Sequence, residues 1–125
     1  MKQMLLVASG GALGSLARYG VYLLAARGWG PVMPWGTLCV NVLGSLVIGL
    51  IAGAADYRLT LHDEARLFLL TGVLGGFTTF SAFALDFARL LQVGDIVKAF
   101  GYVIASVGLS LGAALLGLIL PRALS

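Results

Sequence analysis

Four long apolar stretches, joined by short polar or glycine-rich connections, make up most of the chain. A window of about 19 residues, the length that crosses a bilayer as a helix, places them at residues 4–26, 35–54, 67–91 and 99–120. The connections between them leave no room for a soluble domain. We therefore predict an all-α membrane protein in which residues 1–125 form a single transmembrane domain of four helices.

The third stretch contains residues 75–83, GGFTTFSAF, which are poor material for an uninterrupted lipid-facing helix. The adjacent glycines and the hydroxyl side chains of this run predict a break in the helix near mid-membrane. Backbone groups freed by a break are costly in hydrocarbon, so the break must be buried by protein or face a polar cavity. Discontinuous membrane helices form ion and substrate sites in this way, and the run is therefore the first candidate for function.

Composition agrees with a membrane protein and excludes several other classes. Hydrophobic residues account for 60% of the chain and charged residues for 10%, far from the usage of soluble domains. The single Cys39 rules out an intramolecular disulfide and is expected to pack as a small apolar side chain. No nucleotide loop, metal-ligand cluster or nucleophile–base arrangement points to an enzyme, and a net charge of +3 gives no support for nucleic-acid binding.

The charged residues of the connections give the chain no preferred orientation in the membrane. The side that holds both ends of the four-helix arrangement carries Lys2, Arg58, Arg66 and Arg122, and the other side carries Arg27, Arg89 and Lys98. This near tie predicts insertion both ways, and therefore an antiparallel, dual-topology homodimer. Glycine pairs at four-residue spacing predict close helix contacts, and these pairs are Gly10 and Gly14, Gly49 and Gly53, Gly72 and Gly76, and Gly108 and Gly112.

Polar side chains inside the predicted spans must find partners or a wet cavity. Asn41, in the second span, can fix packing through an interhelical hydrogen bond or can donate to a ligand. Tyr102, Ser106 and Ser110 recur at every fourth position of the fourth span, so they form one stripe of hydroxyls unless each serine bonds to its own helix backbone. Arg18, in the first span, can extend to the interface or hold a vestibule positive.

Acidic residues narrow the choice between classes of transporter. Asp86 and Arg89 are spaced for a local ion pair on one helix face. No carboxylate stands alone at mid-membrane, which argues against a pump driven by a buried acid. A small dual-topology multidrug exporter is the main alternative, although such exporters use a glutamate in the first span and residues 4–26 contain no acid. An assembly subunit without transport is a further alternative.

Three segments together resemble the Fluc (CrcB) family of fluoride channels: residues 10–19 (GGALGSLARY), 36–44 (GTLCVNVLG) and 72–81 (GVLGGFTTFS). Their order, the chain length and the four spans agree along the whole chain. The resemblance implies a passive, fluoride-selective channel that exports fluoride across the bacterial inner membrane and relieves fluoride toxicity. It also implies an antiparallel homodimer with two pores, embedded in membrane lipid.

The resemblance assigns the candidate pore residues. It implies that Phe80 and Phe83 line the pore with their ring edges, which carry partial positive charge and so suit a dehydrated anion. Asn41 is implied as a donor to fluoride, and Arg18 as the positive group of a vestibule. Several modest donors suit a channel, because fluoride must shed its water and still leave again. The hydroxyls of the implied polar track are those of Thr37, Ser81, Tyr102, Ser106 and Ser110.

A structural sodium ion, one per dimer and on the twofold axis, is a further implication of the resemblance. Its ligands are implied to be the backbone carbonyls of Gly75 and Thr78 from each chain, which the helix break would free. Twofold symmetry requires the same atoms from both chains, which fits one ion on the axis.

The chain departs from the family pattern at two positions. Ala82 stands where the family usually has threonine, so one hydroxyl is missing beside the implied pore phenylalanines. Asp86 stands where the family usually has glutamate, which keeps the charge and shortens its reach. We expect the change at Ala82 to reduce conduction.

Overall fold

The structure is a computed structural model that describes residues 1–57 and 60–125, and every regular element within these ranges is helical. Arg58, which enters the charge count above, lies outside the described residues. The elements in chain order are α1 (Lys2–Trp29), α2 (Trp35–Tyr57), α3 (Asp63–Arg66), η1 (Leu67–Leu74), α4 (Gly75–Phe77), α5 (Phe80–Gln92) and α6 (Ile96–Ala123). The elements from α3 to α5 together form the third span, Asp63–Gln92.

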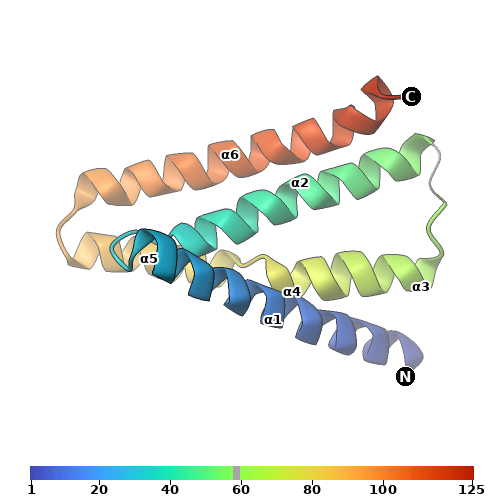
Figure 1. The fold of residues 1–125 in the computed structure, drawn as a ribbon, viewed down its shortest axis with the longest axis horizontal. Helices are drawn as coiled ribbons and strands as arrows, with labels where there is room; N and C mark the ends of the chain where they lie inside the picture. The colour runs from blue at the N-terminus through green and yellow to red at the C-terminus, as the bar shows by residue number, and fades with distance from the viewer. Residues whose placement is uncertain (58–59) are drawn as a thin grey trace.

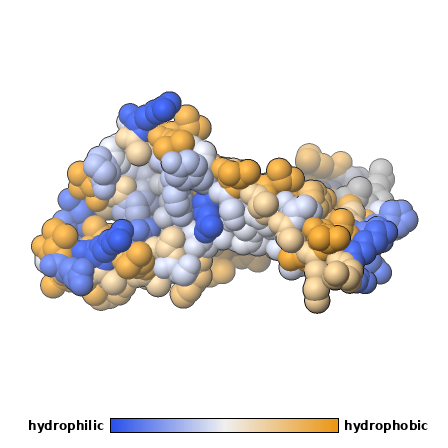
Figure 2. Space-filling view, turned by 90° about the horizontal axis from the view of Figure 1, so that it is seen from below, coloured by the Kyte–Doolittle hydropathy of each residue, from blue (hydrophilic) through white to orange (hydrophobic). Residues whose placement is uncertain are grey.

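Within residues 1–57 and 60–125, four helices are long and apolar enough to cross a membrane, as the sequence predicts: α1, α2, the third span and α6. Their ends extend a little beyond the predicted apolar stretches, because a helix continues into interfacial residues where hydropathy falls. Helices α2 and α6 lie side by side, α1 runs against the third span, and both termini lie at the same end (Figure 1). Figure 2 shows strongly hydrophilic residues mainly toward the two ends, with pale and apolar residues between them.

The third span is broken, as predicted, but at its two threonines rather than at its two glycines. Thr78 (φ −84°, ψ 158°) and Thr79 (φ −154°, ψ 121°) are extended. Gly75 keeps helical angles (φ −63°, ψ −36°), and the preceding segment η1 is a π-helix. The β-branched threonines favour extended backbone, whereas the glycines remain in the helix and serve packing. The run therefore divides into a packed part and an extended part.

Glycines on facing surfaces of α1 and the third span let the two backbones touch. A Cβ atom on Gly10 would lie 2.5 Å from the carbonyl oxygen of Phe68, and one on Gly76 would lie 2.5 Å from that of Gly11. Gly14 is packed still more closely, against the carbonyl oxygen of Val73. Such approaches exclude any side chain and are typical of helices that meet through small residues. The first half of the third span is thereby fixed on α1.

The pair α2 and α6 forms the most extensive helix contact in the described chain. A Cβ atom on Gly49 would overlap the carbonyl oxygen of Ala114, and one on Gly53 would overlap that of Leu118. These two contacts share the same offset in residue number, so the helices run parallel in one register. The predicted contacts of Gly108 and Gly112 are not made within the described chain, where no atom beyond the neighbouring backbone of α6 itself lies within 4 Å of either Cβ position.

The connection between α5 and α6 is a tight turn with its own helix cap. Gly94 adopts φ 86°, in the left-handed region that glycine tolerates. The Asp95 carboxylate accepts a hydrogen bond from the Lys98 backbone N–H at 3.1 Å, and this bond lowers the pKa of Asp95. The capped turn fixes where α6 begins, and with it the register of the α6 hydroxyls against α2.

Candidate functional site

A groove between α2, the helix break, α5 and α6 gathers most of the residues that the sequence selects. We call it the central groove, and its volume is about 470 Å³. Tyr102 is buried, while Thr37, Arg18 and Ser81 line two other cavities. The predicted site residues that line the central groove are Asn41, Gly75, Thr78, Phe80, Phe83, Ser106 and Ser110.

The Asn41 side chain binds the backbone at the helix break. Its Oδ1 accepts a hydrogen bond from the Thr79 N–H at 2.8 Å, and its Nδ2 donates to the Thr79 carbonyl oxygen at 2.9 Å. The amide thereby satisfies both polar backbone groups of one extended residue, as a neighbouring strand would. The interhelical hydrogen bond that the sequence allowed for Asn41 is therefore formed, and one of its two Nδ2 hydrogens is still free.

Thr79, which the sequence did not single out, caps the second half of the broken helix. Its Oγ1 accepts a hydrogen bond from the Ala82 backbone N–H at 3.1 Å and lies 3.3 Å from the Ser81 hydroxyl. Threonine three residues before such an N–H is a common helix N-cap, so the spacing in the sequence held a signal for this role. Thr79 is buried, and its cap sets the direction in which α5 leaves the break.

Two serine hydroxyls of α6 are buried without a partner. The Oγ atoms of Ser106 and Ser110 make no hydrogen bond within the described chain, and Ser106 is only 5% exposed. Back-bonding, the alternative that the sequence left open, is seen instead at Ser9, whose hydroxyl donates to the Leu5 carbonyl at 2.8 Å. Because a buried polar group without a partner is costly, these two hydroxyls point to a ligand in the groove.

Three aromatic rings form a continuous row beside these hydroxyls. The ring centroids of Phe80 and Phe83 are 5.4 Å apart, and those of Phe83 and Tyr102 are 5.3 Å apart. Phe80 is 78% exposed in the single chain, whereas Phe83 is 9% exposed and Tyr102 only 2%. Both pairs of ring planes are inclined rather than stacked flat, which leaves ring edges available along the row.

Polar residues at four-residue spacing line both α2 and α6. The sequence predicts the α6 stripe, and the structure adds Ser45, which lines the central groove four positions after Asn41. The α2 stripe therefore consists of Thr37, Asn41 and Ser45, opposite Tyr102, Ser106 and Ser110 of α6. The residue offset between the stripes equals that between the packed glycines, because the two helices are parallel. The regular spacing of Ser45 after Asn41 was the signal that sequence reasoning missed.

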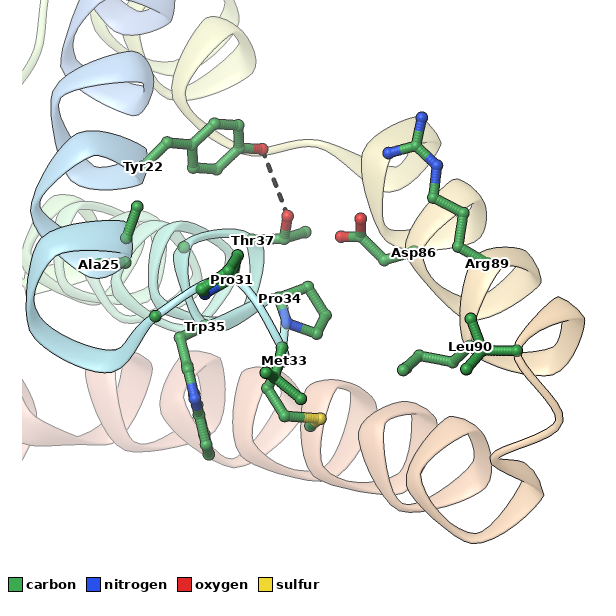
Figure 3. A pocket seen from close by; sticks show the side chains of 15 residues that line it. Tyr22, Ala25, Pro31, Met33, Pro34, Trp35, Thr37, Asp86, Arg89 and Leu90 are labelled. Carbon is green, nitrogen blue, oxygen red and sulfur yellow. Dashed lines mark hydrogen bonds between the residues drawn. The ribbon is translucent and has the colours of Figure 1, made fainter.

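A second cavity, of about 420 Å³, opens at the end of the molecule near the α1–α2 connection, and we call it the end cavity (Figure 3). The Thr37 hydroxyl donates to the Tyr22 hydroxyl oxygen at 3.4 Å within it. Tyr22 lies four residues after Arg18 and so on the same face of α1, a relation that the sequence contains but that we did not use. Polar side chains from α1, α2 and α5 therefore all line the end cavity.

The expected ion pair between Asp86 and Arg89 is not formed. Within the described residues, the Asp86 carboxylate instead accepts a hydrogen bond from the Tyr102 hydroxyl at 3.1 Å. Asp86 and Arg89 both line the end cavity, but the Asp86 side chain points toward Thr37 while the Arg89 guanidinium points away (Figure 3). Spacing along one helix gave Arg89 as a partner, whereas packing of α5 against α6 supplies Tyr102.

A third cavity, of about 440 Å³, lies between α1 and the start of α5, and we call it the Arg18 groove. Arg18 lines it and forms no ion pair with any residue that the structure describes. Ser81 and Ala82 also face this groove rather than the central groove. A hydroxyl at position 82, which the family resemblance leads us to expect, would therefore lie in the Arg18 groove.

The chain is similar to proteins of one family along nearly its whole length. Residues 5–118 match the family model described as CrcB-like protein, Camphor Resistance (CrcB). A curated protein of Rhizobium meliloti, named fluoride-specific ion channel FluC, is 51% identical over 124 residues, 99% of each chain. A protein of the same name from Rhizobium leguminosarum bv. trifolii is 53% identical over 125 residues, 100% of each chain. Another, from Nitrobacter winogradskyi, is 49% identical over 118 residues, 94% of each chain.

Proposed function

The chain belongs to the CrcB family, and we propose that it is a passive, fluoride-selective channel that exports fluoride across the bacterial inner membrane. The family membership confirms the resemblance drawn from the sequence and favours the channel over the small multidrug exporter. Four membrane-spanning helices with short connections suit a multi-pass protein of this class. A channel needs no reacting group, and we assign no catalytic residue.

The observation that carries this proposal is the pair of unpartnered hydroxyls in the central groove. Ser106 and Ser110 have hydroxyls without an acceptor, and Asn41 retains one amide hydrogen on the same groove. A hydroxyl can donate or accept, but the free Asn41 amide hydrogen can only donate, so the three groups together suit an anion that accepts from all of them. A small, strongly hydrated anion gains most from such donors, because they replace water that it must lose on entry.

The aromatic row of Phe80, Phe83 and Tyr102 extends the proposed anion path from the central groove toward the end cavity. An anion beside the edges of Phe80 and Phe83 meets the positive rim of each ring. Tyr102 and Thr37 continue the stripes toward the end cavity, where Asp86 holds the Tyr102 hydroxyl. Arg18 and Ser81 line a separate groove, and we propose that they attract anions at its mouth. The path thus offers several modest contacts and no single deep site, which permits conduction.

We also propose that the active form is an antiparallel homodimer. The central groove is open in the single chain, and exposed Phe80 and Gly75 lie on its wall. An open polar groove would be costly against lipid tails, so a second copy is a suitable cover. The near tie of basic residues supports insertion in both orientations, and the open Gly108 and Gly112 leave a smooth surface on α6 for a neighbour.

We propose that the helix break is the structural sodium site that the family resemblance implies. Within the described chain, no turn, cap or loop N–H donates to the carbonyl oxygen of Gly75 or Thr78. Carbonyl oxygens are suitable ligands for a hard cation, and two antiparallel chains would supply four of them. We propose that these oxygens hold sodium, which would add a fixed positive charge at the centre of the dimer.

Reconstitution in liposomes tests the proposed function. Vesicles are loaded with fluoride or with chloride, and efflux is recorded with ion-selective electrodes. We expect fast fluoride release that needs no proton gradient, together with retention of chloride. Vesicles without protein give the background rate. Proton-driven export of a cationic dye without passive fluoride release would show that the chain is an exporter instead.

A further inference from the structure

The carbonyl groups of Gly75 and Thr78 differ from most others in the third span because they have lost their usual donors. In an α-helix the carbonyl of residue i accepts from the N–H of residue i+4. The donor for Gly75 would therefore be Thr79, and the donor for Thr78 would be Ala82. Both N–H groups are present in the structure, but each donates to a side chain instead.

Asn41 and Thr79 are the side chains that take these donors. The Thr79 N–H donates to Asn41 Oδ1 at 2.8 Å, and the Ala82 N–H donates to Thr79 Oγ1 at 3.1 Å. We propose that these two side chains create the cation site, since each one diverts the N–H that would otherwise saturate a ligand carbonyl. Asn41 is then a positioning residue for the cation as well as a donor on the anion path. This inference rests on the sodium site proposed above.

The same hydrogen bonds also select which oxygens are free. Asn41 Nδ2 donates to the Thr79 carbonyl at 2.9 Å, so of the two extended residues it is Thr79, next to α5, whose carbonyl oxygen is occupied. The carbonyls of Gly75 and Thr78 receive no such donor in the described chain. Both residues line the central groove together with Asn41. A single amide therefore links the wall that receives the anion to the oxygens that receive the cation.

The chemistry of the free oxygens indicates the class of cation. They are neutral backbone carbonyls, and the described residues contain no group of three or more His, Cys, Asp or Glu side chains near them or elsewhere. Neutral, hard oxygen ligands suit an alkali cation such as sodium. Removing the Asn41 acceptor would let the Thr79 N–H return to the Gly75 carbonyl, and the helix would partly close over the site.

Sodium-dependent thermal stability of the purified protein in detergent tests this inference. The melting temperature is measured across a sodium series, with a bulky organic cation keeping the ionic strength constant. We expect stability to rise with sodium in the natural chain. Asn41→Leu removes the acceptor and should raise the sodium concentration at half-effect by roughly tenfold or more, the value of about one hydrogen bond. Asn41→Asp keeps an acceptor for the Thr79 N–H and should shift the half-effect much less.

A second pair of variants covers the case in which Asn41→Leu does not fold. Thr79→Ser keeps the hydroxyl that accepts from Ala82, whereas Thr79→Ala removes it, so only Thr79→Ala should weaken the response to sodium. Ser106→Ala removes a groove hydroxyl that bonds to nothing in the break and should leave the half-effect unchanged. Equal sodium responses in Asn41→Leu, Thr79→Ala and the natural chain would overturn the inference.

Fluoride flux from the same preparations separates this inference from the proposed function. A natural chain that passes fluoride but shows no stabilisation by sodium contradicts the cation site and leaves the channel standing. A natural chain that responds to sodium but passes no fluoride contradicts the channel and leaves the role of Asn41 at the break intact. In flux assays, high sodium should partly restore Thr79→Ala but should not restore Ser106→Ala, whose defect lies on the anion path.

Discussion

The two halves of the third span use opposite kinds of interaction. The first half, from α3 to α4, rests on α1 through glycine contacts between backbones, and the hydroxyl of Thr78, the residue that follows it, donates back to the Leu74 carbonyl. The second half, α5, makes fewer contacts and meets its neighbours through side chains such as Asp86 with Tyr102. The first half is fixed by backbone packing, the second half interacts through polar and aromatic side chains, and the two meet at Thr78 and Thr79.

This difference shows how a short chain can hold a polar path in a membrane. Backbone-to-backbone packing leaves no room for side chains between α1 and the first half, so the first half gives α5 a fixed starting point. Side chains of uneven length leave grooves on both faces of α5, and these grooves collect the polar residues. The hydrogen bonds between Asn41 and Thr79 connect the two halves of the span, because they hold the extended backbone of the break in place.

The anchored half should give the largest effect when it is disturbed. Gly14→Ala places a methyl group against the Val73 carbonyl and 2.9 Å from the Phe77 N atom. Overpacking of this kind costs about 3 kcal/mol, so we expect a large loss of folded protein in a detergent unfolding assay. Gly20→Ala in the same helix should be tolerated, because its Cβ atom would meet no other helix or side chain within 4 Å. Equal stability of the two variants would contradict the role given to the α1 contact.

Changes in the aromatic row should affect flux more than folding. Phe80→Ile alters a ring that is 78% exposed in the single chain, and Phe83→Ile alters one that is 9% exposed. We expect each to lower fluoride flux by roughly tenfold, from the loss of an aromatic contact worth about 1.5 kcal/mol. Only Phe83→Ile should also lower the unfolding temperature of the single chain. Unchanged flux in both variants would show that ring edges do not face the anion.

Substitutions of Ser106 and Ser110 should separate an effect on fluoride flux from an effect on stability most clearly. Ser106→Ala and Ser110→Ala each remove a buried hydroxyl that has no partner in the described chain. Removing such a group costs no hydrogen bond, so unfolding temperatures should stay the same or rise. Fluoride flux should fall, by roughly fivefold for each hydroxyl and more for the double variant. Ser9→Ala, which breaks only a local bond to Leu5, is the matched control and should leave flux unchanged.

The smallest effect is expected at Ala82, where the family resemblance drawn from the sequence leads us to expect threonine. Ala82→Thr restores a hydroxyl on the Arg18 groove, beside Ser81. We expect fluoride flux to rise by a factor of roughly two, since the new donor lies on the wall of the approach rather than in the central groove. Flux from equal amounts of the two proteins provides the comparison. Equal or lower flux would show that the alanine does not limit conduction.

Much of the site could be predicted because a polar residue inside an apolar span is visible in the sequence and is costly in lipid unless it has a role. Asn41, Ser106 and Ser110 are polar residues in apolar spans, and their cost in lipid marks them without any structure. Thr79 and Ser45 were missed, although the cap spacing of the first and the four-residue spacing of the second were present in the sequence. The ion pair of Asp86 and Arg89 was wrong, because a partner on the same helix was assumed where a partner on α6 was available.

The sequence by itself determined four spans, a broken third helix and the polar residues that face inward, since hydropathy and helical spacing are local properties. Only the tertiary structure decided where the break falls and which groups close it. Asn41 and Thr79 are far apart in sequence, and helical spacing gives the face of a residue but not its partner. The parallel register of α2 and α6, set by backbone contact at Gly49 and Gly53, brought the two polar stripes together.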